Sequence, residues 1–442
     1  MLKRIVIFVF CLIFVFCLSG CNLFASDTAE LLSPPALSGE LALIAEAIKE
    51  SAGGVYNFEY PSRGDYRSAV VQTDINGDGS LEAFAFYSMT EGETVTMQIN
   101  ALVNEKGTWR SAAVQKIVAG GVDRVEFCDL DGDGIQEILV GWEIYGTSEM
   151  QIAVYSMGQN TLTQRMLQRY THFITCDLDE DSKNEILIIK TNATEPLNSV
   201  SLFEFNKEGV TEIASCELDS AAKTINEPVV ATLSTGKPAV YIEEIKGIGA
   251  VTEVVFMEKG GLVNPLLQAE TKETVATLRS NLLQIYDINN DDVLEIPVQE
   301  NVPSVAKNEV NEKLYLTNWC SFNGEALVKQ MTTMVNMEDG YYYTLPAKWV
   351  GKIAVLKDTD NHLREIYKYN SEDATVGESL IYFKAVSKAD WDAGNYNSDG
   401  IYEIVNDGVT SYICRISGVA LKEGLTIDSV KANFKLFNDG VF

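Results

Sequence analysis

Acidic residues recur in this chain at a spacing that suits the binding of a divalent cation. The segment from Asp129 to Glu137 has carboxylates at its first, third, fifth and ninth positions. In a tight loop these side chains converge on one hard cation, and the backbone carbonyl of the seventh residue adds another oxygen. Calcium takes six to eight oxygens at about 2.4 Å, whereas magnesium prefers fewer protein ligands and more water. The pattern therefore predicts a structural calcium site.

Four loops follow this pattern, at residues 74–82, 129–137, 177–185 and 287–295. Their expected ligands are Asp74, Asn76, Asp78, Ser80, Glu82, Asp129, Asp131, Asp133, Ile135, Glu137, Asp177, Asp179, Asp181, Lys183, Glu185, Asp287, Asn289, Asp291, Val293 and Glu295, of which Ser80, Ile135, Lys183 and Val293 would use their carbonyl oxygens. Glycine at the sixth position allows the positive φ of such a turn. We expect the loops at 129 and 74 to bind best, the loop at 287 next, and the loop at 177 least, because Ser182 holds its sixth position.

The loops recur with a period of about fifty residues. The first three begin 55 and then 48 residues apart, and the fourth begins two periods later. A degenerate copy fills the missing place at 231–239, where Gly236 is kept and the four acidic positions are lost, so this copy is expected to bind no metal. Five copies at this period indicate stacked or radially arranged units.

Short apolar segments follow each loop, and further strand-length segments separated by turn residues fill each period. Four strands in about fifty residues are typical of a propeller blade. An EF-hand is excluded, because it needs glutamate at position 12 and a following helix. The sequence predicts a mainly β fold, namely a β-propeller of at least five blades with calcium loops, followed by a small α+β domain. One helix is expected before the repeats, over 38–51.

At these loops the chain resembles the FG-GAP/VCBS repeat family, whose blades carry Asp-x-Asp-x-Asp-Gly-x-x-Asp/Glu calcium loops as in the propellers of integrin α-chains. The resemblance covers about residues 70–300. It implies a propeller fold and bound calcium, and it implies no activity.

The N-terminus reads as an export signal. Lys3 and Arg4 precede an apolar segment that is shorter than the ~20 residues of a membrane-spanning helix. Leu18-Ser19-Gly20-Cys21 resembles a bacterial lipobox, which implies lipid attachment at Cys21 and anchoring at the outer side of the cell membrane. The expected divisions are a signal peptide at 1–20, a tether at 21–37, a helix and lead-in at 38–66, the propeller at 67–335 and the C-terminal domain at 336–442.

The C-terminal segment differs from the repeats in its residue pattern. We expect it to end in a helix over Ile427–Phe437, capped by Thr426, with Val430 and Phe434 on one face. A rival interpretation takes residues 395–403 as another blade loop, which would give a seven-bladed ring.

The net charge limits the expected binding partners, and the cysteines limit the expected disulfide bonds. The formal net charge of −29 repels phosphate backbones, so nucleic acid is not an expected partner. After removal of the signal and lipidation of Cys21, five scattered cysteines remain, which is no disulfide framework.

Catalytic motifs are sparse. The chain has two histidines and no nucleophile elbow, P-loop or His-Glu-x-x-His motif. The segment from Arg63 to Asp65 is taken as a plain turn. We therefore expect no enzyme but a membrane-anchored, extracytoplasmic lipoprotein, a calcium-stabilised, non-catalytic binding scaffold for an unknown protein or glycan. The alternative is a surface glycan-active hydrolase, which needs a pair of carboxylates on the propeller face, about 5–9.5 Å apart and outside the loops.

Overall fold

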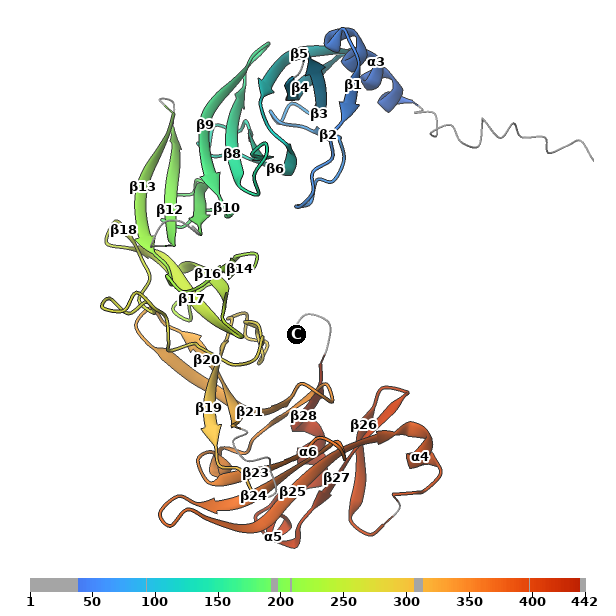
Figure 1. The fold of residues 1–442 in the computed structure, drawn as a ribbon, viewed down its shortest axis with the longest axis vertical. Coiled ribbons are helices and arrows are strands. Elements are labelled where there is room, and N and C mark those ends of the chain that lie inside the picture. The colour runs from blue at the N-terminus through green and yellow to red at the C-terminus, as the bar shows by residue number, and fades with distance from the viewer. Residues whose placement is uncertain are drawn as a thin grey trace, which may run out of the picture.

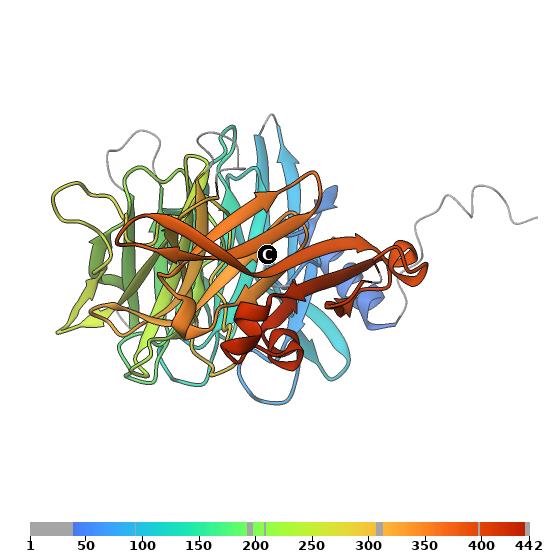
Figure 2. The same ribbon diagram turned by 90° about the horizontal axis from the view of Figure 1, so that it is seen from below.

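The computed structural model describes residues 39–437, apart from 93, 192–197, 207–208, 306–312 and 397. The predicted signal segment, Cys21 and the tether at 21–37 lie outside the described residues. Within the described part the chain is mainly β, as predicted, and its strands form six antiparallel sheets. The sheets follow one another in chain order along an open arc (Figure 1). Seen from below, the C-terminal sheets stand in front of the N-terminal ones (Figure 2).

The first sheet stands at one end of the arc and carries the N-terminal helix. Its strands are β1 (Tyr56–Phe58), β2 (Val70–Thr73), β3 (Glu82–Glu91), β4 (Thr94–Glu105) and β5 (Thr108–Ile117). Helix α3 (Glu40–Ala52), close to the predicted 38–51, packs Ile44 and Ile48 against Tyr87 and Trp109 of this sheet. The helix thus covers the outer face of the first sheet.

The second and third sheets are simple four-stranded meanders. The second contains β6 (Gly121–Cys128), β7 (Glu137–Glu143), β8 (Met150–Met157) and β9 (Leu162–Tyr170), and the third contains β10 (His172–Cys176), β11 (Glu185–Lys190), β12 (Ser199–Asn206) and β13 (Gly209–Glu217). The fourth sheet contains β14 (Thr224–Ile225), β15 (Val229–Thr232), β16 (Pro238–Lys246), β17 (Gly249–Glu258) and β18 (Gly261–Val263).

The fifth and sixth sheets complete the arc. The fifth contains β19 (Ile296–Val302), β20 (Leu314–Phe322), β21 (Leu327–Asn336), β22 (Tyr341–Thr344) and β28 (Phe434–Leu436). The sixth contains β23 (Ile353–Asp358), β24 (Leu363–Asn370), β25 (Thr375–Ser387), β26 (Ile401–Asn406) and β27 (Thr410–Ile416). Short helical turns lie beside them, namely η1 (Ala347–Trp349), α4 (Lys388–Asp392), α5 (Gly418–Lys422) and α6 (Ile427–Asn433). Strand pairing in the fifth sheet crosses residue 336, and the domain division at that residue stays a prediction.

Hydrophobic cores lie between successive sheets. In β11, Leu187 and Ile189 face the fourth sheet, while Ile186 and Ile188 face the second. Because side chains alternate between the two faces of a strand, a strand buried on both faces reads as one continuous apolar run. This explains the apolar segments that follow the loops. Among the described residues, no buried hydrophobic cluster joins the sixth sheet to the first.

The last predicted helix is shorter than expected. Helix α6 begins after Thr426, which forms a capping box with Ser429, but it ends at Asn433. Phe434 then starts strand β28, pairs with Tyr343 and stacks on Tyr341 with ring centroids 4.6 Å apart. Packing against the fifth sheet overrides the helical pattern, so the prediction of a helix to residue 437 was wrong at its C-terminal end.

Within residues 39–437, as far as they are described, no helix combines the length and the apolar character needed to cross a membrane.

Candidate functional site

The four acidic loops share one strand register and one backbone conformation. In each, the ninth-position glutamate pairs across the hairpin with the residue before the first aspartate, namely Thr73, Cys128, Cys176 and Tyr286. The first aspartate accepts a hydrogen bond from the sixth backbone N–H at 2.9 or 3.0 Å. The fifth accepts one from the seventh N–H, and the ninth-position glutamate accepts one from the second N–H. The repeated sequence thus produces a repeated structure.

The third-position side chains differ between the loops. Asn76, Asp131 and Asp179 each accept a hydrogen bond from the N–H two residues later, at 2.9–3.2 Å. Asn289 instead donates through its amide to Asp291 and Glu295, at 2.9 and 3.3 Å. Its Nδ2 therefore faces the other ligands, so binding a cation in this loop requires the amide to turn its oxygen inward.

Two positions in each loop adopt left-handed backbone. In the four loops the sixth residue has φ between 65° and 87°, as expected for this turn. This holds also where the sixth residue is not glycine, at Ser182 and Asp292. The fourth residue also has positive φ, between 60° and 74°, and this was not predicted. Glycine holds both places at 74–82 and 129–137, whereas Glu180 and Asn290 hold the fourth place in the other two. A non-glycine residue in this region costs on the order of 1 kcal/mol or more, so these two loops depend more on their ligand contacts.

The second residue of each loop is an anchor that sequence reasoning missed. Ile75, Leu130, Leu178 and Ile288 are all buried, each in a hydrophobic cluster at its own sheet. The signal was present, because an aliphatic residue holds this place in all four copies. The first two loops also touch, since the N–H of Gln136 donates to the carbonyl of Ile75 at 2.8 Å. The loops therefore lie at the joints between sheets.

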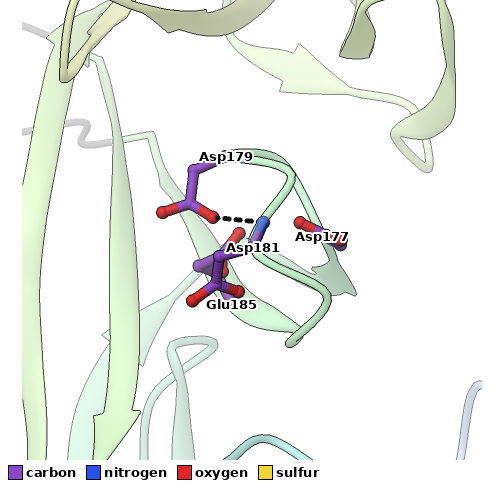
Figure 3. A group of neighbouring side chains, drawn as sticks. All are labelled: Asp177, Asp179, Asp181 and Glu185. Atoms are coloured by element: carbon purple, nitrogen blue, oxygen red, sulfur yellow. Dashed lines mark hydrogen bonds between the residues drawn. The ribbon is translucent and has the colours of Figure 1, made fainter.

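The carboxylates gather most closely in two loops. Asp177, Asp179, Asp181 and Glu185 each have an oxygen within 4.8 Å of the others, and Figure 3 shows them at one turn of the chain. Asp129, Asp131 and Glu137 form the second such group among the described residues. The loops at 74 and 287 have asparagine at the third position and so offer one carboxylate fewer. The expected order of affinity, with the loop at 177 last, stays a prediction.

The buried glutamates of these loops show the excess of negative charge. Burial, and then the charges of the loop aspartates, raise the pKa of Glu137, Glu185 and Glu295 to about 7. Burial likewise raises the pKa of Glu82. A carboxylate that is hard to ionise beside other carboxylates is stabilised by a bound cation, which reverses the sign of the local field.

The degenerate copy forms a plain hairpin turn. The N–H of Leu233 donates to the carbonyl of Lys237, and Gly236 has φ of 84°. The turn between β15 and β16 has no carboxylate at the ligand positions.

A second feature is a cavity of about 840 Å³, away from the loops, at the strand ends of the second, third and fourth sheets. Asp123 and His172 stand near the starts of β6 and β10, whose other ends lead into the acidic loops. Tyr170 ends β9, Lys190 ends β11, and Lys223 directly precedes β14. These residues are far apart in sequence, and sequence reasoning did not bring them together.

A buried aspartate organises one wall of the cavity. Asp123 binds Arg63 through two hydrogen bonds, at 2.7 and 2.8 Å, and accepts a hydrogen bond from the hydroxyl of Tyr170. Burial alone would raise the pKa of Asp123, but the hydrogen bonds from Arg63 and Tyr170 lower it below its usual value. Arg63 is thus held in an ion pair, and the turn that contains it is a structural part of the cavity wall.

Gly141 makes room for this arrangement. A Cβ at this position on β7 would lie 2.0 Å from the hydroxyl oxygen of Tyr170, which no side chain tolerates. The glycine therefore lets the tyrosine hydroxyl pass close to the β7 backbone and reach Asp123.

A second network connects three sheets beside the cavity. Arg124 on β6 lies over the ring of Phe173 and forms ion pairs with Glu126 and Glu227, both at 2.7 Å. The Nε2 of His172 donates to the carbonyl oxygen of Ile225 at 3.0 Å, and its Nδ1 lies 3.4 Å from a carboxylate oxygen of Glu227. The hydrogen bond from His172 and, against the effect of burial, that from Arg124 lower the pKa of Glu227 to about 2. The other histidine, His362, is exposed and contacts Asp339 at 2.6 Å in the C-terminal part.

Cationic side chains outnumber acidic ones in the cavity lining. Four lysines and arginines line it, namely Arg63, Arg169, Lys190 and Lys223, against the two carboxylates of Asp123 and Glu149. Arg63 pairs with Asp123, and Arg169 pairs with Glu149 at 2.9 Å. Among the described residues, Lys190 and Lys223 have no acidic partner.

Most of the tryptophans lie in the hydrophobic cores, and the cysteines that the structure describes form no disulfide. Trp109, Trp142, Trp319 and Trp349 are buried in the cores. The five cysteines at 128, 176, 216, 320 and 414 are free thiols, in agreement with the absence of a predicted disulfide framework.

Comparison with known proteins gives structural matches only. No family model and no curated protein sequence matches the chain. Among solved structures, an exotype rhamnogalacturonan lyase matches at 11% identity and a TM-score of 0.30, over 73% of this chain and 83% of the other. A rhamnogalacturonan lyase from Bacillus licheniformis matches at 11% identity and a TM-score of 0.30, over 80% of this chain and 90% of the other. An exo-β-1,3-galactanase from Phanerochaete chrysosporium matches at 9% identity and a TM-score of 0.25, over 82% of this chain and 90% of the other.

These matches contradict one expectation from the sequence. The proteins matched over most of both chains are carbohydrate-active enzymes, whereas we expected a non-catalytic scaffold and no enzyme. That expectation is therefore withdrawn. At these identities and TM-scores the matches assign neither a substrate nor a catalytic residue to this chain.

Proposed function

We propose that the chain is a glycan-active enzyme and that the cavity at the second, third and fourth sheets binds an acidic polysaccharide. The observation that carries the proposal is the charge of this cavity. The chain as a whole has a net charge of −29, yet the cavity lining has more cations than carboxylates. Unpaired lysines in a concave, partly desolvated site attract anionic groups. Sugar carboxylates are such groups, and they are found in extracellular acidic glycans.

The state of the two carboxyl groups in the cavity lining favours elimination over hydrolysis. A glycosidase needs two carboxyl groups, one of them kept protonated by a raised pKa. Here Asp123 and Glu149 are both held by arginines, and the pKa of Asp123 is lowered. The hydrolase alternative from the sequence, which needs a free carboxylate pair on the face of the fold, is therefore less well supported than a reaction without such a pair.

Elimination suits a cavity that neutralises a uronate. When lysines neutralise the sugar carboxylate, the hydrogen on the adjacent carbon becomes more acidic. A base removes this proton, the C–H electron pair forms a C=C bond, and the C–O bond to the next sugar breaks as its oxygen takes a proton. Among the side chains that line the cavity, His172 is of a type that exchanges protons in such steps. The hydroxyl of Tyr170 is held by Asp123, and burial and then the charge of Asp123 raise the pKa of Tyr170.

The test compares acidic and neutral glycans. The chain is incubated with polygalacturonate, alginate, galactan and xylan in millimolar calcium, and both unsaturated uronate and new reducing ends are measured. We expect cleavage of an acidic glycan with both products. Reducing ends without unsaturated product would identify a hydrolase, and preferential cleavage of neutral glycans would contradict the proposed substrate class.

The two unpaired lysines provide the sharpest variant. We expect Lys190→Gln combined with Lys223→Gln to raise the KM for the acidic glycan about thirtyfold, because the two lost charge contacts, at about 1 kcal/mol each, together remove about 2 kcal/mol of binding free energy. Lys106→Gln with Lys422→Gln removes the same charge from two exposed lysines outside the cavity lining and is the matched control. Equal KM values for the two double variants would rule out the lysines as the binding groups.

We also propose that the six sheets are blades of an open β-propeller and that calcium occupies its acidic loops. The common conformation of the loops, their raised glutamate pKa values and their place at the joints between sheets support this proposal. The resemblance to FG-GAP/VCBS repeats rests on the same loops.

The proposed setting is the outer side of the cell membrane, with Cys21 as the lipid anchor. The lipobox-like Leu18-Ser19-Gly20-Cys21 behind an apolar segment supports it. Metabolic labelling with a fatty acid analogue tests this setting, since Cys21→Ser is expected to abolish the label.

A further inference from the structure

Three fully buried carboxyl groups meet at the joint between the third and fourth sheets. Asp219 follows the last strand of the third sheet, and Glu244 and Glu253 lie on β16 and β17 of the fourth. The backbone N–H of Asp219 donates to Glu253 at 2.9 Å, so the group spans the two sheets. None of these residues belongs to an acidic loop.

Two of the three carboxylates are fully provided with donors. Asp219 accepts from the Nζ of Lys246 at 2.9 Å and from the N–H groups of Thr274 and Ala221 at 2.7 and 2.8 Å. Glu253 accepts, besides the N–H of Asp219, the amide of Asn264 and the hydroxyl of Thr274, both at 2.7 Å. These donors replace part of the hydration that the two carboxyl groups lose in their buried positions.

Glu244 differs from its two neighbours. Neither of its side-chain oxygens has a donor among the described residues, although both are buried. Glu244 on β16 is the diagonal cross-strand neighbour of Glu253 on β17, on the same face of the sheet, and the carboxyl group of Glu253 acts on it. Two neighbouring buried carboxylates, one of them without any donor, repel each other and lose their hydration, which strongly disfavours the doubly ionised pair.

We propose that Glu244 carries a proton, which it donates to Glu253, and that this shared proton is a pH-sensitive lock between the third and fourth sheets. Burial and then the charges of Glu253 and Asp219 raise the pKa of Glu244, in agreement with the geometry. Burial also raises the pKa of Glu253 itself.

The other ionisable groups around Glu244 and Glu253 are either held in ion pairs or neutral. Lys246 binds Asp219 and Glu273, at 2.9 and 2.7 Å. Glu217 at the end of β13 pairs with Lys272 at 2.5 Å. Burial and then the charge of Glu253 raise the pKa of the Cys216 thiol to about 12, so it stays neutral. No described cation is left to neutralise Glu244, and a proton is the remaining means.

The lock lies beside the cavity. Glu244 pairs across the sheet with Ile225, which lines the cavity two residues after Lys223. Lys190 ends β11 of the third sheet and Lys223 directly precedes β14 of the fourth, so the joint that Glu244 closes sets the separation of these two lysines. This link to ligand binding rests on the proposed function, whereas the lock itself does not.

The first test is the pH dependence of stability. The unfolded chain releases this proton near its ordinary pKa of 4.5, and the folded chain retains it. The folded state therefore binds one proton more, and stability falls as pH rises above that value until the raised folded pKa is passed. Each pH unit in this window lowers the folding equilibrium constant about tenfold.

The variant Glu244→Gln replaces the shared proton by a permanent amide donor. In denaturant unfolding with saturating calcium, between about pH 6 and pH 9, we expect it to remove this one-proton slope, so that its stability relative to wild type rises about tenfold per pH unit. Glu258→Gln, an exposed change on the neighbouring strand β17, should keep the wild-type slope. A wild-type slope in Glu244→Gln would overturn the lock.

Two further measurements keep the proposal open to refutation if Glu244→Gln does not fold. Infrared spectra of the calcium-bound wild type at neutral pH should show a buried, protonated carboxyl band, which Glu253→Gln should also remove by ending the proton sharing. Absence of the band in wild type would refute the lock. As pH rises toward 10, where Glu244 loses its proton, polygalacturonate binding should weaken more in wild type than in Glu244→Gln, because the loss of lysine charge is the same in both. Loss of all polygalacturonate binding would count against the proposed function and leave the stability result standing.

Discussion

Chelation of calcium at about pH 8 is expected to lower the melting temperature of the chain, and at about pH 5.5 the same chelation is expected to have little effect. The pKa of Glu137, Glu185 and Glu295 is raised to about 7 in the metal-free loops, above the ordinary value of 4.5. The metal-free folded state therefore holds protons that the unfolded chain has lost, and its stability falls as pH rises from 4.5 to about 7. Calcium needs the ionised glutamates, so it binds and stabilises mainly above this window.

The size of the effect follows from mass action. At extracellular affinities of about 10⁻⁴ to 10⁻³ M, millimolar calcium adds on the order of 1 kcal/mol per site. The measurement is a melting curve with calcium, with magnesium and with chelator at both pH values. Asp129→Ala should reduce the calcium-dependent shift, whereas Asp407→Ala, in a turn outside the acidic loops, should leave it unchanged. A chelator-induced shift of the same size at both pH values would contradict the part given to the glutamates.

Replacement of Gly249 by alanine is expected to destabilise the chain by about 3 kcal/mol or more. A Cβ at this position would lie 2.2 Å from the backbone oxygen of Arg279, and neither backbone can move without breaking the paired hydrogen bonds between Ala250 and Arg279. The shift would also disturb the buried ion pair of Arg279 with Glu243 at 2.5 Å. Breaking a buried pair is costly because one charge is left uncompensated.

Denaturant unfolding measures this effect, and Gly418→Ala is its control. Gly418 has no neighbour within 4 Å of a built Cβ and lies in helix α5, where alanine is favoured over glycine. Gly418→Ala should be neutral or slightly stabilising. If Gly249→Ala were equally neutral, the loop that contains Arg279 would have to be free to move away from the fourth sheet.

The sequence allowed prediction of the features that depend on local spacing. The four loops, the apolar strands that follow them and the N-terminal helix all lie where the pattern placed them. The prediction that glycine is needed at the sixth loop position was incomplete, because Gly77 and Gly132 at the fourth position also allow a positive φ. The helix after Thr426 was predicted too long, since local pattern gives no sign that Phe434 is drawn into the fifth sheet.

The cavity could not be predicted from the sequence. Its residues come from strand ends in three sheets and from a lead-in loop, and no fixed spacing connects Arg63, Asp123 and Lys223. Glu244 and Glu253 likewise read as ordinary charged residues, and only the packing of two sheets makes one of them a carboxyl without donors. Long-range pairing of this kind leaves a signal in the fold and none in the local pattern.

The open arc of sheets has a mechanical consequence. Each sheet is fixed to the next by one hydrophobic layer, and no described core ties the last sheet back to the first. A closed ring would share any tilt among all its members, whereas in an open series the tilts add from one member to the next. The span between helix α3 and the sixth sheet is therefore a lever that amplifies small rotations at any single interface, and a pair of fluorescent labels at these two ends would report them.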